Sequence, residues 1–320
     1  MKKIIVILGL LVSILPTTAF GQLIACRDSI KDGYDFWLYL PDDYNDTVRD
    51  KPVVMFLHGK SLSGKNLAMV RRYGCIDALS RGLDIDAIVV APQAQSSWEP
   101  QKVMDVYNWV ARHYAVDANR FYVLGMSMGG YGTLDFVATY PEKVAAGIAL
   151  CGGSTKKDLC GLNEVPLWIV HGTADTAIPV RCSQQVVDAM CQCGDTSRLL
   201  FDKLKNENHS RLARIFYLEQ TYDWLFSHSL SDPDRVANKD YTISSAIMAN
   251  AYSGLSKRDL NVIDKPTYSA NAGKKYHVVK SGDTLSKIAV EHNTTVTFLC
   301  KLNNLKRTDN LRVGRKIRIK

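Results

Sequence analysis

The chain has 320 residues, of which 46% are hydrophobic and 22% are charged, and its formal net charge is +8. This length is enough for about two domains, and the composition excludes a disordered chain and a polytopic membrane protein. The charge is uneven, because residues 257–320 hold 15 Lys and Arg against five Asp and Glu, which leaves a net charge of −2 on residues 1–256. A strongly basic segment on a mildly acidic body argues against a nucleic-acid-binding protein.

Residues 1–21 have the pattern of a secretory signal peptide. Two lysines precede a nearly unbroken apolar run at residues 4–15, and small residues before Gln22 offer a cleavage site. The run is shorter than the roughly 20 residues that span a bilayer, so we expect a secreted or periplasmic protein with no transmembrane segment after signal removal. Residues 23–26 also look like a lipoprotein cleavage box, which leaves lipidation of Cys26 as an alternative.

The eight cysteines all lie beyond the signal sequence. In an oxidising compartment an even number permits disulfide bonds, but the spacing does not reveal the pairing. Cys191 and Cys193 could suggest a metal or redox site, yet no second Cys/His pair completes a four-ligand zinc set. We therefore expect structural disulfides or buried thiols, and neither a metal nor another cofactor.

Short β-rich segments alternate with stretches of helical length from residue 34 to residue 228. The predicted strands are residues 34–40, 53–58, 87–91, 121–125, 147–151, 167–171 and 199–204, and the predicted helices are residues 103–114, 130–140, 181–190 and 212–226. Such alternation predicts an α/β fold with a mostly parallel sheet flanked by helices. Continuous apolar runs suit strands that are buried on both faces.

The predicted domain boundaries follow from these patterns. They are a signal peptide at residues 1–21, an α/β domain at 22–230, an arm and linker at 231–275 and a small C-terminal module at 276–320. Within segment 231–275, residues 242–252 could form a capped helix that packs against the preceding α/β domain. Alternatively, they could form an ordered arm. Pro266 and the small residues that follow it indicate a linker.

Residues 125–129 read Gly-Met-Ser-Met-Gly and stand between a predicted strand and a predicted helix. This is the setting of a nucleophile elbow, a sharp turn that exposes a serine hydroxyl at the carboxyl edge of the sheet. Gly125 and Gly129 leave room for the turn, since side chains there would collide with the neighbouring strand and helix. Ser127 is therefore the candidate nucleophile.

An acid and a histidine follow in the chain order that belongs to this motif. Asp175 lies in the loop after the predicted strand 167–171, and His209 is the one histidine of seven that falls in a loop between a predicted strand and a helix. His209 would take the proton of Ser127 during attack and return it to the leaving group. Asp175 would hold the imidazole in the correct tautomer.

The oxyanion that develops during acyl transfer needs preorganised donors, each commonly worth about 3 kcal/mol. The backbone N–H of Met128 supplies one donor by construction of the elbow. We expect the second at the backbone N–H of Lys60, in the turn after residues 53–58, where Gly59 permits the turn. His58 would mainly support this loop.

Residues 34–228 resemble the α/β-hydrolases, specifically the secreted esterase and predicted-peptidase branch related to polyhydroxybutyrate depolymerases and feruloyl or acetylxylan esterases. The matching motifs are residues 56–59, 116–133 and 171–180. The resemblance implies a carboxylic-ester hydrolase without a metal, acting through an acyl-enzyme on an acylated saccharide or small ester. Trp98 matches an aromatic residue beside the substrate pocket of this branch, although it could equally be a packing residue. With His58 and Gly59 it forms the candidate substrate-binding set.

Residues 276–320 resemble a LysM domain, with a strand, a turn, a helix capped by Thr284, a second helix and a closing strand whose Val313, Ile317 and Ile319 face the core. The family binds glycans that contain N-acetylglucosamine in a shallow groove. The matching positions here are Gly282, Asp283 and Thr284 on one side and the segment from Leu305 to Leu311 on the other. We expect peptidoglycan as the polymer, although the basic residues could also be only a solvated face.

Three functions therefore stay open. The first is an exported serine carboxylesterase held on cell-wall glycan, the second a prolyl-oligopeptidase-like serine peptidase, and the third a peptidoglycan-binding protein whose hydrolase fold is catalytically idle. The complete Ser, Asp and His set disfavours the third function. No propeller-sized domain precedes the catalytic one, which disfavours the second.

Overall fold

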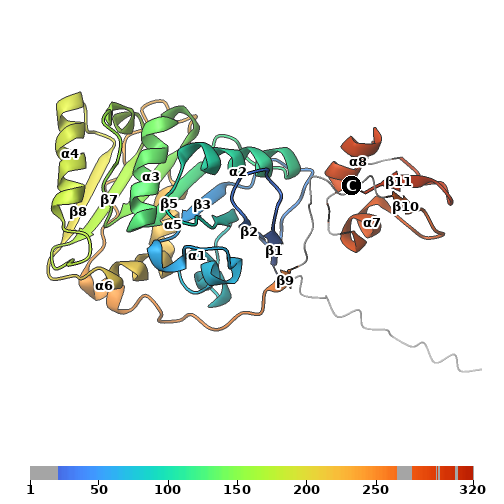
Figure 1. The fold of residues 1–320 in the computed structure, drawn as a ribbon, viewed down its shortest axis with the longest axis horizontal. Coiled ribbons are helices and arrows are strands. Elements are labelled where there is room, and N and C mark those ends of the chain that lie inside the picture. Colours follow the sequence, from blue (N-terminus) through green and yellow to red (C-terminus); the bar gives the residue numbers. More distant parts are fainter. Residues whose placement is uncertain (1–20, 265–275, 293, 295, 307–308, 320) are drawn as a thin grey trace, which may run out of the picture.

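A computed structural model describes residues 21–264, 276–292, 294, 296–306 and 309–319 (Figure 1). Residues 1–20 of the predicted signal peptide (1–21) and residues 265–275 of the predicted arm and linker (231–275) lie outside this range. Among the described residues, no helix has both the length and the apolar character that crossing a membrane requires.

The first unit is built on a nine-stranded sheet with the order β8-β7-β6-β5-β3-β4-β2-β1-β9. The strands are β1 (Gln22–Cys26), β2 (Phe36–Leu40), β3 (Val53–Leu57), β4 (Ile88–Pro92), β5 (Phe121–Met126), β6 (Ala146–Leu150), β7 (Leu167–Gly172), β8 (Leu199–Leu204) and β9 (Asn261–Ile263). Strands β3 to β8 pair in parallel, whereas β2 runs antiparallel to β1 and β4. The predicted α/β fold with a mostly parallel sheet is confirmed.

Helices cover both faces of this sheet (Figure 1). One face carries α2 (Pro100–His113), α3 (Met128–Thr139) and α4 (Arg181–Cys193), and the other carries α1 (Cys75–Ser80), α5 (Glu219–Phe226) and α6 (Ser245–Ala249). Alternate residues of the strands supply the two cores, so that in β3 Met55 packs on the α2 side and Phe56 on the α1 side. All of β3 is buried, as expected of a parallel strand covered on both faces.

The segment after α5 returns to this unit. Ser244 Oγ accepts a hydrogen bond from the Ile247 N–H at 3.2 Å and caps α6, whose Met248 is fully buried. Strand β9 then pairs in parallel with β1 at the edge of the sheet. Of the two alternatives for residues 242–252, the capped helix on the body is therefore correct.

Cys26 is the last residue of β1 and is buried. Cleavage at a lipoprotein box would make Cys26 the first residue and would remove Gln22 to Ala25, which pair with β2 and β9. Lipidation of Cys26 would therefore remove nearly the whole of β1, the strand between β2 and β9.

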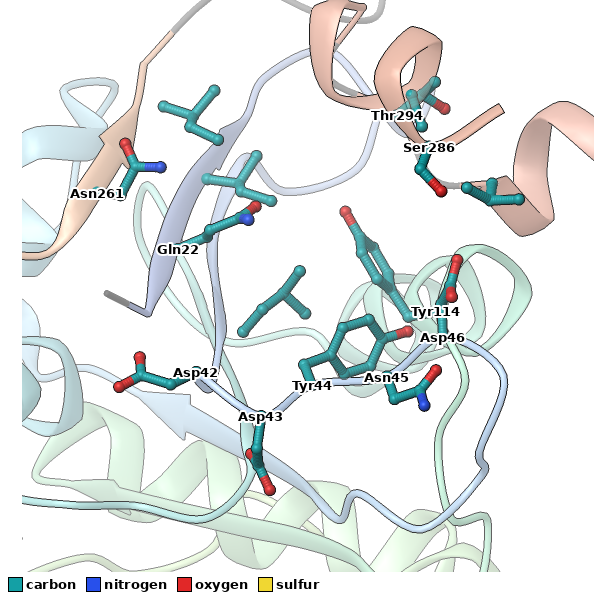
Figure 2. A pocket seen from close by; sticks show the side chains of 15 residues that line it. Gln22, Asp42, Asp43, Tyr44, Asn45, Asp46, Tyr114, Asn261, Ser286 and Thr294 are labelled. Carbon is teal, nitrogen blue, oxygen red and sulfur yellow. The ribbon is translucent and has the colours of Figure 1, made fainter. Parts of the chain in front are cut away.

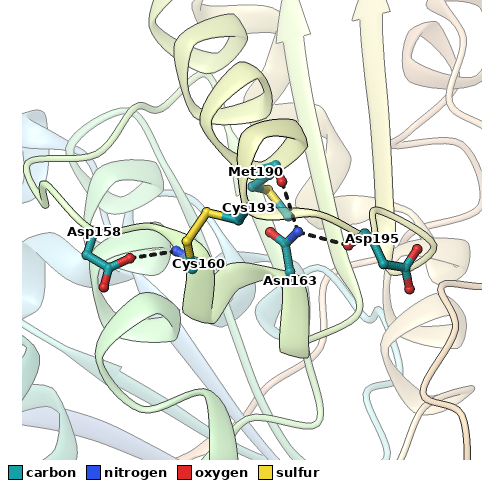
Figure 3. The surroundings of a disulfide bond; sticks show 6 residues. All are labelled: Asp158, Cys160, Asn163, Met190, Cys193 and Asp195. Atoms are coloured by element: carbon teal, nitrogen blue, oxygen red, sulfur yellow. Dashed lines mark hydrogen bonds between the residues drawn. A yellow bond between two sulfur atoms is a disulfide. The ribbon is translucent and has the colours of Figure 1, made fainter.

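A disulfide bond joins Cys160 to Cys193, and so ties a short 3-10 helix (η4, Cys160–Glu164) to the end of α4 (Figure 3). Asn163 Nδ2 strengthens the same junction by donating to the Met190 carbonyl at 2.9 Å and the Asp195 carbonyl at 2.8 Å. Cys26, Cys75 and Cys151 are buried thiols, whereas Cys191 is exposed. The prediction of structural disulfides and buried thiols is confirmed.

The C-terminal unit has its own two-stranded antiparallel sheet, β10 (Tyr276–Val278) with β11 (Lys316–Arg318), and two helices, α7 (Leu285–Glu291) and α8 (Val296–Asn303). Its core includes Ile288, Leu299 and Ile317. Thr284 Oγ1 accepts from the Lys287 N–H at 3.2 Å, so the predicted helix cap is confirmed. The prediction for Val313 is wrong, because this residue lies in the turn before β11 and is 69% exposed.

Candidate active site

Ser127 forms the turn between β5 and α3 with φ 59° and ψ −119°. A residue with a Cβ rarely adopts this conformation, and it persists only where the surroundings enforce it. A Cβ on Gly129 would lie 1.8 Å from the Leu57 carbonyl oxygen, and one on Gly125 would lie 2.4 Å from the Gly129 carbonyl oxygen. Both glycines are thus required by the close approach of β3, β5 and α3. The turn leaves Ser127 partly exposed at the carboxyl edge of the sheet.

Asp175 and His209 form a hydrogen-bonded pair beyond the ends of β7 and β8. His209 Nδ1 lies 2.7 Å from Asp175 Oδ2, and the Asp175 side chain is fully buried. Asp175 Oδ1 accepts from the backbone N–H groups of Ala177 and Ile178, each at 2.9 Å. Because these bonds fix one carboxylate oxygen, the other stays directed at His209, and the Nδ1–H of His209 donates to it.

Cys151 lies between the elbow and this pair, directly after β6. Its sulfur is in hydrogen-bonding contact with the backbone of Ser127 and with the carboxyl group of Asp175. Potential ligand atoms of Cys151, Asp175 and His209 all lie within 4.8 Å of one another. Ser127, Asp175 and His209 thus follow β5, β7 and β8 at the same edge of the sheet, with Cys151 after β6 between the elbow and the pair.

Burial, followed by the charge of Asp175, raises the pKa of the Cys151 thiol. The thiol is therefore protonated and can donate its S–H to the carboxylate. No sequence motif marks the position of Cys151 beside the acid.

The two predicted oxyanion donors belong to first residues of helices. Met128 begins α3 and Lys60 begins the 3-10 helix η1 (Lys60–Leu62), so neither backbone N–H has an acceptor within its own helix. Gly59 brings the η1 turn against the elbow, since a Cβ on Gly59 would lie 3.6 Å from the Ser127 Cβ. The turn that carries Lys60 and the turn that carries Met128 are therefore neighbours, and the role of their N–H groups stays a prediction.

Tyr73 fixes the η1 turn and was missed by the sequence analysis. Its hydroxyl oxygen accepts from the Gly59 N–H at 2.9 Å, and a Cβ on Gly59 would lie 2.7 Å from the same oxygen. Gly59 is therefore required by this contact. Tyr73 belongs to no motif, so only the fold reveals that it supports the turn.

His58 is wrong as a substrate-binding residue, because its side chain is fully buried and both ring nitrogens are bonded to the backbone. Nδ1–H donates to the Gly59 carbonyl at 2.8 Å, and Nε2 accepts from the Ala94 N–H at 3.1 Å. Trp98 is only 7% exposed, and its indole N–H donates to the His58 carbonyl at 3.1 Å. Both side chains support the loop that carries Gly59. This agrees with the alternative interpretations, in which His58 supports the loop and Trp98 is a packing residue.

Mild acid should destabilise the protein through His58. Burial lowers the pKa of His58 to about 4, against about 6.5 in an unfolded chain. Between these values the unfolded state binds more protons, so stability rises with pH in this window and is lost as pH falls. We expect His58 alone to cost about 2–3 kcal/mol between pH 7 and pH 4.5.

Urea unfolding at both pH values measures this loss, with His58→Asn as the comparison. The variant should be less stable at pH 7 but should show a shallower dependence on pH. The same slope in both proteins would show that His58 does not cause the acid sensitivity.

The C-terminal unit holds a groove of about 260 Å³ between the turn before α7 and the segment before β11. Its lining residues are Asp283, Thr284, Leu285, Ser286, Val296, Asp309, Asn310 and Leu311. Gly282 forms the adjoining turn with φ 83°, whereas Leu305 packs against the core of the unit. A groove is therefore present at the predicted position. Leu305 packs against the core of the unit and does not line the groove, whereas Asp309 and Asn310 add polar groups to the lining.

A second cavity, of about 650 Å³, is lined by residues of both units (Figure 2). Tyr44 and Tyr114 lie on the side of the first unit, and Ser286 and Thr294 lie on the side of the second. Neither Ser127 nor the Asp175–His209 pair lines this cavity.

The first unit is an α/β domain whose candidate serine, acid and histidine follow β5, β7 and β8 at the carboxyl edge of the sheet. More particularly, residues 97–235 match the family model described as Phospholipase/Carboxylesterase, and residues 277–320 match that of the LysM domain. The first unit is therefore similar to carboxylesterases over these residues, and the C-terminal unit is similar to LysM domains. Both matches support the predicted class, a carboxylic ester hydrolase with a LysM module.

Two curated proteins and one crystal structure illustrate these similarities. An endolysin from Bacillus phage PZA is 51% identical over 49 residues, which is 15% of this chain and 19% of the endolysin. A bifunctional acetylxylan esterase/xylanase from Neocallimastix patriciarum is 27% identical over 156 residues, 46% of this chain and 22% of that enzyme. A thermostable esterase has 23% identity and a TM-score of 0.54, covering 65% of this chain and 63% of its own, which shows a shared fold. The chain spans about a fifth of the length of these two curated relatives.

Proposed function

We propose that the protein is an exported serine esterase in which Ser127, His209 and Asp175 act as nucleophile, general base and orienting acid. The observation that carries this proposal is the 2.7 Å contact between His209 Nδ1 and the buried Asp175 carboxylate, beside a serine in a nucleophile-elbow conformation. A buried carboxylate on Nδ1 leaves Nε2 as the proton acceptor of the imidazole.

The reaction follows from these positions. Ser127 Oγ attacks the ester carbonyl while His209 Nε2 takes its proton, and the N–H groups of Met128 and Lys60 stabilise the oxyanion. The tetrahedral intermediate expels the alcohol, which receives the proton from His209, and leaves an acyl group on Ser127. Water, activated by His209, then attacks the acyl-enzyme and releases the acid.

The proposed substrate is an acylated saccharide or a small ester, and the proposed location is the cell wall. The LysM groove supports attachment to a glycan that contains N-acetylglucosamine, with peptidoglycan as the polymer. The signal-like residues 1–21 and the disulfide bond support an oxidising compartment outside the cytosol.

The activity is tested with p-nitrophenyl acetate and butyrate, a panel of sugar esters, and prolyl-peptide nitroanilides. We expect turnover of the esters only. Turnover of the nitroanilides would support the peptidase instead, and ester turnover equal to that of Ser127→Ala would support the idle hydrolase fold.

Attachment to the wall is tested by sedimentation with purified peptidoglycan. The full mature protein should co-sediment, and a chain ending before residue 276 should stay in the supernatant. Equal sedimentation of both proteins would refute a role for the LysM unit as the anchor.

Loss of the Tyr73 hydroxyl should slow catalysis more than it weakens substrate binding. Tyr73→Phe removes the acceptor for the Gly59 N–H and loosens the turn that carries the Lys60 donor. A neutral hydrogen bond is worth about 1 kcal/mol, so we expect kcat to fall about fivefold with little change in KM. Tyr140→Phe is the matched control, since the Tyr140 hydroxyl bonds the exposed Gln101 side chain. An equal loss of kcat in both variants would contradict the assigned role.

A further inference from the structure

The LysM unit contains a cluster of histidine and carboxylate side chains that the esterase reaction does not use. His277 is the middle residue of β10 and only 6% exposed, Glu291 ends α7, and His292 follows it. His277 Nδ1 lies 2.8 Å from His292 Nε2. Glu291 Oε1 lies 3.9 Å from the first of these nitrogens and 3.7 Å from the second. Two imidazole nitrogens and one carboxylate oxygen therefore form a compact triangle.

This triangle has the dimensions of a zinc coordination sphere. Atoms separated by 2.8, 3.7 and 3.9 Å lie on a circle with a radius of about 2.1 Å, so one point lies at that distance from all three. Zinc bonds to imidazole nitrogen and carboxylate oxygen are about 2.0–2.2 Å long. In a tetrahedral site the ligand atoms are about 3.3 Å apart, so the nitrogens must separate by about 0.5 Å and the carboxylate must approach by a similar amount. The exposed Glu291 side chain is free to make this movement.

Asp283 orients the buried histidine for such a role. Asp283 Oδ2 lies 2.7 Å from His277 Nε2 and accepts a further bond from the Lys280 backbone N–H at 2.7 Å. His277 Nε2 therefore carries the proton, and the lone pair of the neutral ring is on Nδ1, on the side of His292 and Glu291. A carboxylate on the remote nitrogen of a metal-binding histidine is a common outer-shell arrangement at zinc sites.

A hydrogen bond from His292 Nε2–H to His277 Nδ1 is the simpler account of the 2.8 Å contact, but it gives Glu291 no part. We propose that His277, Glu291 and His292 bind one Zn²⁺ ion, with Asp283 as the supporting carboxylate and water in the fourth position. Among divalent metal ions, zinc suits a ligand set made of imidazole and carboxylate groups. Because Asp283 also lines the groove, the ion would stabilise the turn at one wall of the proposed glycan site.

The test is titration of the mature full-length protein with zinc chloride by isothermal calorimetry, and with Co²⁺ followed by visible absorption. We expect one ion per chain with the spectrum of a four-coordinate cobalt site. His292→Ala should weaken binding at least about 100-fold, and Asp283→Asn about 10- to 100-fold.

His209→Ala is the matched control, because it removes a histidine from the other cluster of potential ligands, formed with Cys151 and Asp175. This variant should bind zinc like the wild type. Glu291→Gln changes the exposed end of α7 and should bind zinc at least about 10-fold more weakly, while its circular dichroism spectrum stays that of the wild type. Identical isotherms for the wild type, His292→Ala and Glu291→Gln would overturn the proposal, as would loss of binding only in His209→Ala. Glu291→Gln and His292→Ala leave Ser127 and its partners intact, so ester hydrolysis reports separately on the proposed function.

Discussion

Ser127→Ala is expected to lower kcat for ester hydrolysis by at least about 10⁴-fold, because the variant has no group to form the acyl-enzyme. The alanine keeps the Cβ and the surrounding hydrogen bonds, so the variant should fold like the wild type. Steady-state kinetics with p-nitrophenyl acetate measure the loss. A fall in kcat of less than tenfold would show that Ser127 is not the nucleophile.

The same position allows a test of backbone strain. The wild type and the Ser127→Ala variant both carry a Cβ at φ 59°, whereas glycine adopts this conformation without steric cost. Relief of about 1–3 kcal/mol of strain exceeds the 0.5–1 kcal/mol that glycine loses through its greater unfolded entropy. Ser127→Gly should therefore be about 1 kcal/mol more stable than Ser127→Ala in urea unfolding, although both are inactive. A less stable glycine variant would show that the elbow is not strained.

Removal of the disulfide bond is expected to have the largest effect on stability. The bond closes a loop between residues 33 positions apart, and the chain-entropy relation gives about 3.7 kcal/mol for a loop of this length. The double variant Cys160→Ser/Cys193→Ser should therefore unfold at a clearly lower urea concentration. Ester hydrolysis at low temperature should persist, because neither cysteine belongs to the candidate site.

Cys191→Ser is the matched control for the disulfide. Cys191 lies on the same helix, two residues before Cys193, and its thiol is exposed and outside the disulfide. This variant should keep the wild-type stability, and reduction with dithiothreitol should lower the stability of the wild type to that of the double variant. A double variant within about 0.5 kcal/mol of Cys191→Ser would contradict a stabilising role for the bond.

The central sheet could be predicted because its strands are continuous apolar runs between amphipathic helices. The edge could not. Strand β9 has three residues, none of them fully buried, and it forms only through pairing with β1 more than 230 residues earlier in the chain. The predicted helix at residues 212–226 is divided at Leu218 into a 3-10 helix (η5, Ser210–Tyr217) and α5, because tertiary packing overrides the single amphipathic pattern.

The candidate triad could be predicted because loops after neighbouring parallel strands meet at one edge of the sheet. Asp175 and His209 follow β7 and β8, and the structure pairs them at 2.7 Å. Tyr73 and Cys151 could not be predicted in the same way. Both residues lie in segments without a recognisable motif, and only the tertiary structure brings them to the site. No local sequence pattern shows which group a buried hydroxyl or thiol will contact. The His277–His292 contact likewise joins residues 15 positions apart from a strand and the end of a helix.

The central claim is that Ser127 forms an acyl-enzyme, and trapping this intermediate tests it most directly. The wild-type protein is mixed with p-nitrophenyl butyrate, quenched in acid within the burst phase, digested and analysed by mass spectrometry. We predict one butyryl group per chain on the peptide that contains Ser127, and none in Ser127→Ala. An acyl group on another residue, such as Cys191, or steady turnover by the wild type with no acylated peptide, would contradict the account.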